Sequence, residues 1–229
     1  RHFAQAPLEA NMPVWLGLLS VLNATLLNRR SQAVVAYTER LGRLSAYLQQ
    51  LVMESNGKSV DLAGQALEIP TGPVIWGQTG TPGQHAFFQA LHQGSDVIPV
   101  DFIGVVRPSA GERGDPLELT ANLLAQSQAL MQGRNEASLR AEQRCPGNRP
   151  SNTLLLEALT PHTLGALIAL YEHRTLVEAS IWGINAFDQF GVELGKVLAQ
   201  DLKPVLAGGD QADWLDGSTA GLIERFRRP

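Results

Sequence analysis

The sequence predicts an α/β fold: a three-layer α/β/α sandwich with a mainly parallel sheet, followed by a helical carboxy-terminal tail. Short apolar runs such as QAVVAY (32–37) and PVIW (73–76) recur along the chain, separated by stretches of helical periodicity. Strands buried on both faces have continuous apolar sequences, and parallel neighbours need crossover connections between them. Hydrophobic residues make up 44% of the 229 residues, which suffices for the core of such a sandwich.

The expected elements alternate along the chain. Expected strands span 32–37, 73–76, 96–104 and 151–159. Expected helices span 12–28, 39–54, 82–92, much of 115–143, 161–180 and 187–203. Asn11 and Pro13 favour a helix start, and Pro99 removes one donor from the third strand. Asn56 and Gly57 tolerate the left-handed turn that would end the helix over 39–54.

The connections are polar and rich in turn-forming residues. Residues 58–70 are expected to form a loop or hairpin, and the Pro/Gly-punctuated segment 134–152 a surface connection. We assign 1–203 to the sheet domain and 204–229 to a carboxy-terminal tail.

Composition and charge exclude several classes of protein. The net charge of −4 comes without a stripe of Lys and Arg, so we expect no nucleic-acid binding. The longest apolar run, 14–22, is far too short to cross a membrane. Cys145 is the single cysteine, which leaves no disulfide framework and indicates a reduced, cytoplasmic protein. His85 and His92 could share a helix face, but no Cys or carboxylate stands at ligand spacing, so we expect no metal.

The stretch LQQLVMESNGK (48–58) places an acid where the end of a helix favours a base. Glu54 falls in the last turn of the expected helix, beside the negative end of the helix dipole. Either Glu54 is an ordinary exposed side chain, with a penalty of roughly a few tenths of a kcal/mol, or it is placed for chemistry.

The turn after PVIW leads into a helix that carries a histidine. Thr81 is expected to cap this helix, with Pro82 in the first helical position and Gln84 completing a capping box. His85 then lies in the first turn, at the carboxyl edge of the sheet, where parallel sheets bind ligands. The alternative is an ordinary half-buried histidine.

The run FDQFGVELGK (187–196) places Gln189, Glu193 and Lys196 on one helix stripe, at i, i+4 and i+7. From helix geometry alone, a solvated face with a Glu193–Lys196 ion pair is the better interpretation.

Taken together, these stretches resemble the glucose-6-phosphate isomerase (phosphoglucose isomerase) family. The resemblance covers nearly all 229 residues, in the order of the family. The most distinctive motifs are F-D-Q-x-G-V-E-x-x-K and GQHAF-x-Q-x-x-HQG. The other matching stretches are APLEANMPVWLGLL, MESNGK, TGPVIWG, IPVDFIG, GNRPSNTL and PHTLGALIALYEH.

The resemblance implies a sugar-isomerase-type α/β/α domain. It also implies the interconversion of glucose 6-phosphate and fructose 6-phosphate, in glycolysis and gluconeogenesis, without a cofactor. Members of the family are homodimers whose active sites lie at the subunit interface. Carried over by motif, Glu54 resembles the base that moves a proton between C1 and C2 of the sugar. Gln50 and Gln189 match substrate-binding positions, and His85 and Lys196 match the residues that open the sugar ring, the His being supplied to the neighbouring subunit's site.

The sequence also departs from the family pattern. Where the family commonly has WGEPGTNGQH, Gln78, Thr79 and Pro82 replace Glu, Pro and Asn. The family's phosphate-binding loop and its G-G-R segment have no counterpart among these residues, and the sequence opens without a methionine. We therefore expect the carboxy-terminal portion of the enzyme, with little activity by itself.

Two alternatives are a non-catalytic sugar-phosphate-binding regulatory domain and an isomerase portion fused to another sugar-phosphate enzyme. The joint presence of Glu54, His85 and Lys196 argues against a regulator, because a sensor needs no proton-transfer groups.

Overall fold

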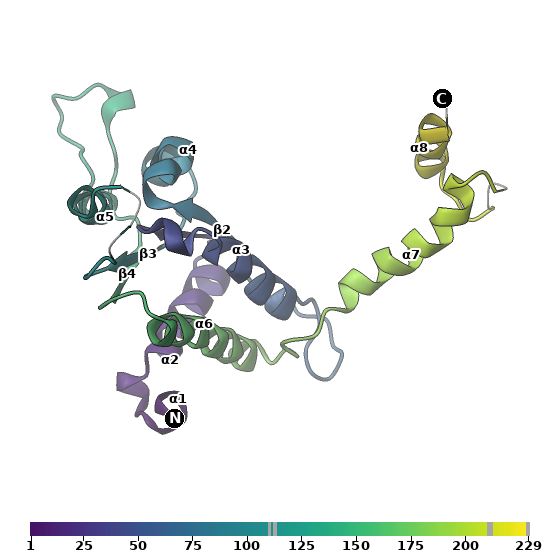
Figure 1. The fold of residues 1–229 in the computed structure, drawn as a ribbon, viewed down its shortest axis with the longest axis horizontal. Helices are drawn as coiled ribbons and strands as arrows, with labels where there is room; N and C mark the ends of the chain where they lie inside the picture. Colours follow the sequence, from purple (N-terminus) through teal and green to yellow (C-terminus); the bar gives the residue numbers. More distant parts are fainter. Residues whose placement is uncertain (110, 112–113, 210–212, 228–229) are drawn as a thin grey trace. The chain divides into compact units, whose positions relative to one another are not determined.

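The computed structural model describes residues 1–109, 111, 114–209 and 213–227. The chain forms two compact units, Arg1–Phe187 and Asp188–Pro229 (Figure 1). The first unit contains the sheet, and the second contains the last two helices. The boundary predicted between 203 and 204 lies inside the first of those two helices, and the assignment of a separate tail stays a prediction.

Four parallel strands form the sheet of the first unit, in the order β2-β1-β3-β4. They are β1 (Ser31–Ala36), β2 (Val74–Thr79), β3 (Val100–Val105) and β4 (Ser151–Leu156). Each predicted strand is present, and the parallel pairing confirms the predicted α/β class. The central strands β1 and β3 are buried along nearly their whole length, which explains their continuous apolar sequences.

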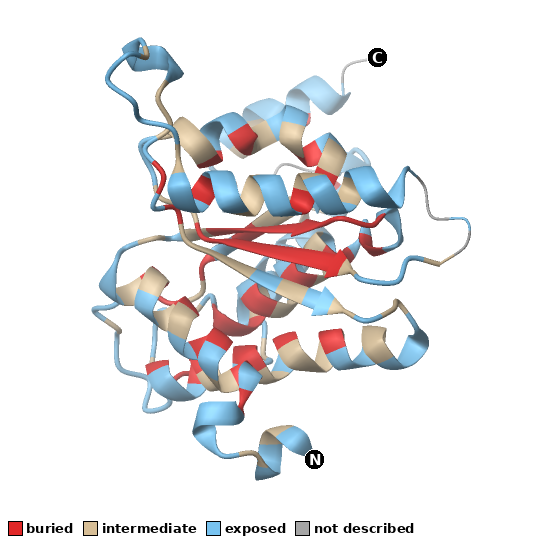
Figure 2. Ribbon diagram, turned by 90° about the vertical axis from the view of Figure 1, so that its left-hand side faces the viewer, coloured by how far each residue is buried: buried red, intermediate tan, exposed pale blue. Residues whose placement is uncertain are grey.

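Helices cover both faces of this sheet (Figure 2). The α-helices of the first unit are α1 (His2–Gln5), α2 (Met12–Val21), α3 (Leu44–Leu48), α4 (Gly80–Gln93), α5 (Pro116–Gln132) and α6 (Pro161–Trp182). Its shorter segments are η1 (Leu8–Ala10), η2 (Leu22–Leu26), η3 (Glu39–Leu41), η4 (Gln49–Glu54) and η5 (Ala141–Gln143). The second unit contains α7 (Phe190–Leu206) and α8 (Gly217–Arg227). Within the described part of the chain, no helix has the length and apolarity needed to cross a membrane.

The two faces of the sheet have separate cores. On one face, α3, η4 and α6 pack around Val34 and Ile103. On the other face, α4 and α5 pack around Val35 and Phe102. Because successive side chains of a strand point to opposite faces, neighbouring residues of one strand contribute to different cores. Any residue carried by η4 therefore lies across the sheet from any residue carried by α4.

The helices predicted over 12–28 and 39–54 do not stay α-helical to their ends. α2 passes into the π-helical segment η2, and α3 passes into the π-helical segment η4. The predicted left-handed turn after the second helix is wrong, because neither Asn56 nor Gly57 has a positive φ. Gly57 is instead required by close approach, since a Cβ atom there would collide with the carbonyl oxygen of Met53.

The start of α4 also differs from the prediction. The helix begins at Gly80, one residue before the predicted cap Thr81, and Thr79 precedes it without a side-chain capping bond. A Cβ atom on Gly80 would collide with the Tyr37 ring, so the helix packs closely on the end of β1. Gln84, expected to complete the cap, instead donates to the Tyr37 hydroxyl at 2.8 Å. Tertiary contacts have replaced the predicted local cap.

Candidate active site

Glu54 is the last residue of the π-helical segment η4 and is half-buried. The Gln50 side-chain amide Nε2 lies 3.5 Å from Glu54 Oε2, at the outer limit of a hydrogen bond. The structure thus brings two of the predicted site residues together. π-Helical turns within α-helices frequently occur at functional sites, but the second π-helical segment, η2, carries no predicted site residue, so this conformation alone does not assign a role to Glu54.

Glu54 does not lie at the carboxyl edge of the sheet, where ligand groups were expected. The segment from η3 to η4 leaves the carboxyl end of β1 and returns to the beginning of β2. Its last residue therefore lies toward the amino ends of the strands. Asn56, two residues further on, donates to Glu178 of α6, and Glu178 is bonded to Arg174, which reaches Asp101 near the start of β3.

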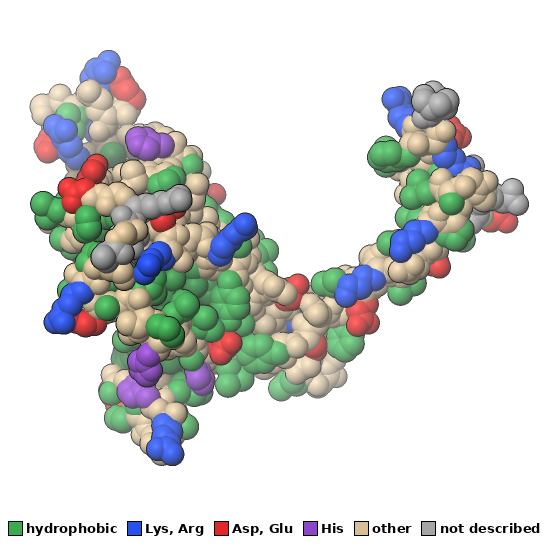
Figure 3. Space-filling model, viewed as in Figure 1, with side chains coloured by type: hydrophobic (Ala, Val, Ile, Leu, Met, Phe, Trp, Pro, Cys, Tyr) green, Lys and Arg blue, Asp and Glu red, His purple; other side chains and the backbone are tan. Residues whose placement is uncertain are grey.

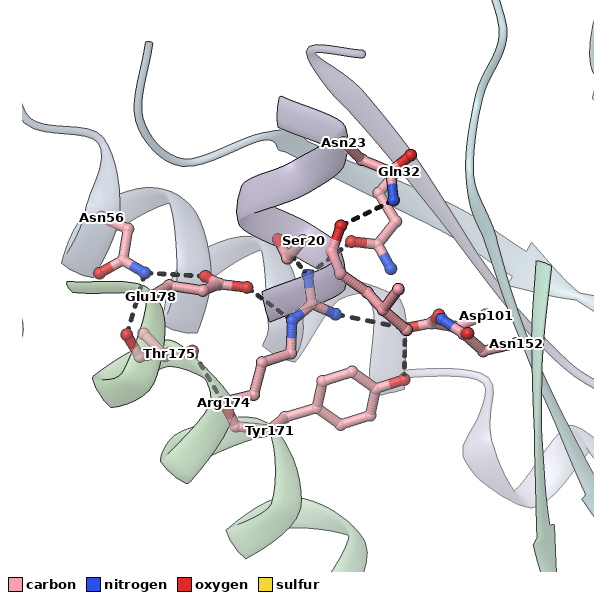
Figure 4. Close-up of polar contacts among 11 residues, drawn as sticks. Ser20, Asn23, Gln32, Asn56, Asp101, Asn152, Tyr171, Arg174, Thr175 and Glu178 are labelled. Carbon is pink, nitrogen blue, oxygen red and sulfur yellow. Dashed lines mark hydrogen bonds and ion pairs between the residues drawn. The ribbon is translucent and has the colours of Figure 1, made fainter. Parts of the chain in front are cut away.

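A buried polar cluster at this amino edge was not predicted from the sequence (Figure 4). Its centre is the Arg174 guanidinium, whose Nε donates to Glu178 Oε1 at 2.6 Å and whose Nη1 donates to Asp101 Oδ2 at 3.2 Å. The same guanidinium also bonds the side chains of Ser20 and Gln32. One signal was present in the sequence: Arg174 and Glu178 stand at i, i+4 in the helix LIALYEHRTLVEASIW, a spacing at which an arginine and a glutamate can pair.

The charges in the cluster stabilise one another. Burial by itself lowers the pKa of an arginine, but the carboxylates of Glu178 and Asp101 outweigh it and raise the pKa of Arg174 above its usual value. Burial, reinforced by the charge on Asp101, raises the pKa of Tyr171 well above its ordinary value. The Tyr171 hydroxyl accordingly keeps its proton and donates it to Asp101 Oδ2 at 3.1 Å. The cluster therefore keeps the Arg174 guanidinium charged and buried near the amino ends of the strands.

His85 lies in the second turn of α4, close to the carboxyl end of β2, and is exposed. Since α4 and η4 cover opposite faces of the sheet, His85 and Glu54 are separated by the sheet itself. They are also displaced toward opposite ends of its strands. Within one copy of this unit the structure therefore does not bring His85 and Glu54 together.

Gln189 and Lys196 belong to the second unit. Gln189 immediately precedes α7, Lys196 lies two turns into it, and both side chains are exposed. The apolar residues between and beside them are exposed as well (Figure 3), namely Phe190, Val192, Leu194 and Val197. α7 thus presents a polar stripe and an apolar stripe, the amphipathic pattern that the sequence indicated.

Two hollows in the described part of the first unit are not lined by the predicted site residues. One of about 470 Å³ lies between β4, α6 and the amino-terminal residues, and one of about 250 Å³ lies beside α5. Both are lined mainly by apolar side chains, and neither includes Gln50, Glu54 or His85. Over the residues that the structure describes, no group of three or more His, Cys, Asp and Glu side chains is arranged to hold a metal ion.

Comparison with known proteins connects these residues to one family. A family model described as phosphoglucose isomerase matches residues 1–223. A glucose-6-phosphate isomerase of Polaromonas naphthalenivorans is 57% identical over 226 residues, covering 99% of this chain and 43% of that protein. One of Methylocella silvestris is 53% identical over 246 residues, covering 99% of this chain and 45% of that protein.

Solved structures give the same result. The crystal structure of a glucose-6-phosphate isomerase from Chlamydia trachomatis superposes with a TM-score of 0.86 at 39% identity. It covers 98% of this chain, whereas this chain covers 43% of that one. The chain thus spans a little under half the length of the relatives it matches. With a family model matched over residues 1–223 and the fold of a solved member, this chain belongs to the phosphoglucose isomerase family.

Proposed function

We propose that this chain supplies part of a cytoplasmic glucose-6-phosphate isomerase, which interconverts glucose 6-phosphate and fructose 6-phosphate through a cis-enediol without a cofactor. The observation that carries the proposal is the 57% identity to a glucose-6-phosphate isomerase over 99% of the chain. In this proposal Glu54 is the base that carries the proton between C1 and C2 of the sugar.

The residue types suit this reaction. Isomerising an aldose to a ketose requires one base that reaches two neighbouring carbons from the same side of a planar enediol. A carboxylate can do this without a metal, and a positioned proton transfer contributes roughly 10² to 10⁴ in rate. Glu54 is half-buried, and the neighbouring Gln50 amide, 3.5 Å away, can donate to the carboxylate or to a sugar hydroxyl.

The remaining predicted residues take supporting roles. His85 and Lys196 open the sugar ring by moving a proton to and from the ring oxygen, and Gln189 contacts the substrate. The separation of His85 from Glu54 by the sheet supports a site completed by a second copy, in which the His85 of one subunit serves the Glu54 of its partner. The exposed apolar side chains of α7 are consistent with a helix that is covered in the assembled enzyme.

The test uses a chimera in which this chain replaces the matched 226 residues of the Polaromonas naphthalenivorans protein. We expect the chimera to convert fructose 6-phosphate, and Glu54→Gln to lower kcat by roughly 10²-fold or more with little change in KM. Glu39→Gln is the matched control, since Glu39 is an exposed acid in η3, at the other end of the same connection.

A Glu54→Gln chimera with the activity of its parent would remove Glu54 from the mechanism. A chimera that binds fructose 6-phosphate but does not convert it, with or without Glu54, would favour the regulatory alternative.

A further inference from the structure

Asn56 is anchored in the interior although it follows a surface helix. Its side chain is 0% exposed, and its amide nitrogen Nδ2 donates to the Thr175 carbonyl oxygen at 3.1 Å and to Glu178 Oε2 at 2.9 Å. Both acceptors belong to α6, so these bonds tie the end of η4 to a different helix (Figure 4). Asn56 lies two residues after Glu54.

The acceptor of this bond is itself held on both sides. Glu178 Oε1 accepts from Arg174 Nε at 2.6 Å, and the Arg174 guanidinium reaches Asp101 of β3 at 3.2 Å. All three charged side chains are at most 2% exposed. Low local polarity strengthens each of these bonds and makes an unpaired member costly, so the cluster has one favoured arrangement. Asn56 is therefore connected to the sheet through Glu178 and Arg174.

The backbone around Asn56 is enclosed as well. A Cβ atom on Gly72 would come within 2.8 Å of the Asn56 carbonyl oxygen, and the Gly57 amide donates to the Met53 carbonyl oxygen at 3.0 Å. By contrast, within the part of the chain that the structure describes, the Glu54 carboxylate has one polar side-chain neighbour, the Gln50 amide at 3.5 Å. The direction of the Glu54 side chain is thus set mainly by where its backbone is held.

We propose that Asn56 is a positioning residue for Glu54, and that Glu178 and Arg174 transmit the rigidity of the sheet to the π-helical turn that carries the base. This inference rests on the proposed role of Glu54. A base that serves two carbons needs its backbone fixed, because a displacement of about 1 Å can lower the rate by roughly 10²-fold.

The test compares two asparagines of the same cluster in the chimera described above. Asn56→Ala removes the bonds that tie the end of η4 to α6. Asn152→Ala, on β4 and away from η4, removes a 2.8 Å bond to Asp101 Oδ1 of β3. We expect both variants to lose thermal stability, and only Asn56→Ala to lower kcat, by roughly 10- to 100-fold, with KM within about threefold of the parent.

A second variant covers the case in which Asn56→Ala does not fold. Glu178→Gln keeps the shape of the side chain and an oxygen for Arg174, but presents an amide donor to Asn56. The Asn56 amide must then either face this donor or reverse and lose its bond to the Thr175 carbonyl oxygen. We expect it to lower kcat in the same way. Equal kcat losses in Asn56→Ala and Asn152→Ala, or unchanged kcat in a folded Asn56→Ala or Glu178→Gln chimera, would overturn the positioning role.

The proposed function and the positioning role of Asn56 can be refuted by different results. If Glu54→Gln alone leaves the rate unchanged, the base is wrongly assigned. If Glu54→Gln abolishes turnover while Asn56→Ala does not affect it, the base stands and the positioning role falls.

Discussion

At the scale of single residues, the Arg174 guanidinium is held by four side chains, those of Ser20, Gln32, Asp101 and Glu178. It is 1% exposed and bonds the carboxylates of Asp101 and Glu178, which lie on different elements. Removing one partner of such a buried set costs about 3–5 kcal/mol, because the other charges lose their compensation. The cluster therefore fixes how α6 lies against the sheet, and its ionisation makes stability depend on pH.

Tyr171 predicts the direction of that dependence. Burial, and next the charge on Asp101, raise the pKa of Tyr171 well above the ordinary value of 10.0 that an unfolded chain retains. Its stabilising contribution is complete below pH 10 and is lost as the pH rises toward the folded-state pKa. Above pH 10 this group should lower the free energy of unfolding by up to about 1.4 kcal/mol per pH unit.

Urea unfolding followed from pH 8 to pH 11 measures this effect. Tyr171→Phe should show a shallower alkaline decline than the parent, together with a lower stability at pH 8 from the lost bond to Asp101. Tyr47→Phe should keep most of the steep decline, because burial and Glu172 raise the pKa of the surface residue Tyr47 less than burial and Asp101 raise that of Tyr171. Parallel declines for Tyr171→Phe and the parent would contradict the prediction.

At the scale of the elements, the close crossing of α2 and α6 positions the helix that anchors Asn56. A Cβ atom on Gly17 of α2 would come within 2.6 Å of Val177 Cγ1 on α6, so the two helices pack at a distance that only glycine allows. Gly165, near the start of α6, has no atom within 4 Å of the corresponding position and is exposed.

These two glycines should respond in opposite directions. Gly17→Ala should lower the free energy of unfolding by about 1–3 kcal/mol, because the helices must separate. Gly165→Ala should raise it by up to about 1 kcal/mol, because alanine favours the helix and meets no neighbour. Thermal unfolding of the purified chain measures both. A Gly17→Ala variant with an unchanged or higher free energy of unfolding would contradict this prediction, because it would show that α2 and α6 can move apart without cost.

At the scale of the whole molecule, the five predicted site residues are divided between two compact units, with Gln50, Glu54 and His85 in the first and Gln189 and Lys196 in the second. The chain also spans less than half the length of its relatives. The phosphate-binding loop and the arginine segment that the resemblance implies have no counterpart among these residues. In the proposed enzyme, the groups needed for one turnover are therefore shared between this chain and the rest of the enzyme.

By itself, the 229-residue chain should convert fructose 6-phosphate at a negligible rate, while the chimera with the Polaromonas naphthalenivorans protein should be active. A coupled assay for glucose 6-phosphate at equal concentrations of the two proteins measures the difference. Turnover by the chain alone that matched the chimera would show that these residues suffice.

Much of the fold could be predicted because its signals are local. The apolar runs of β1 and β3 predict buried parallel strands, and the family motifs around Glu54 and Lys196 predict candidate site residues. The order of the strands could not be predicted, and it is this order that decides that His85 and Glu54 lie on opposite faces. The burial of Asn56 and the position at which α4 starts depend on contacts between segments distant in the sequence. Turn and capping propensities describe only neighbouring residues, so they could not predict these contacts.

The π-helical form of η4 limits which sequence changes in this segment preserve the direction of the Glu54 side chain. Removing one residue from Gln49–Glu54 would allow the turn to relax into an ordinary α-helix, which rotates by about 100° per residue. The Glu54 carboxylate would then point in a different direction, although every remaining residue of the segment was unchanged. Substitutions at positions of the segment other than Gln50 and Glu54 should leave this direction unchanged, whereas the loss of one residue should alter it.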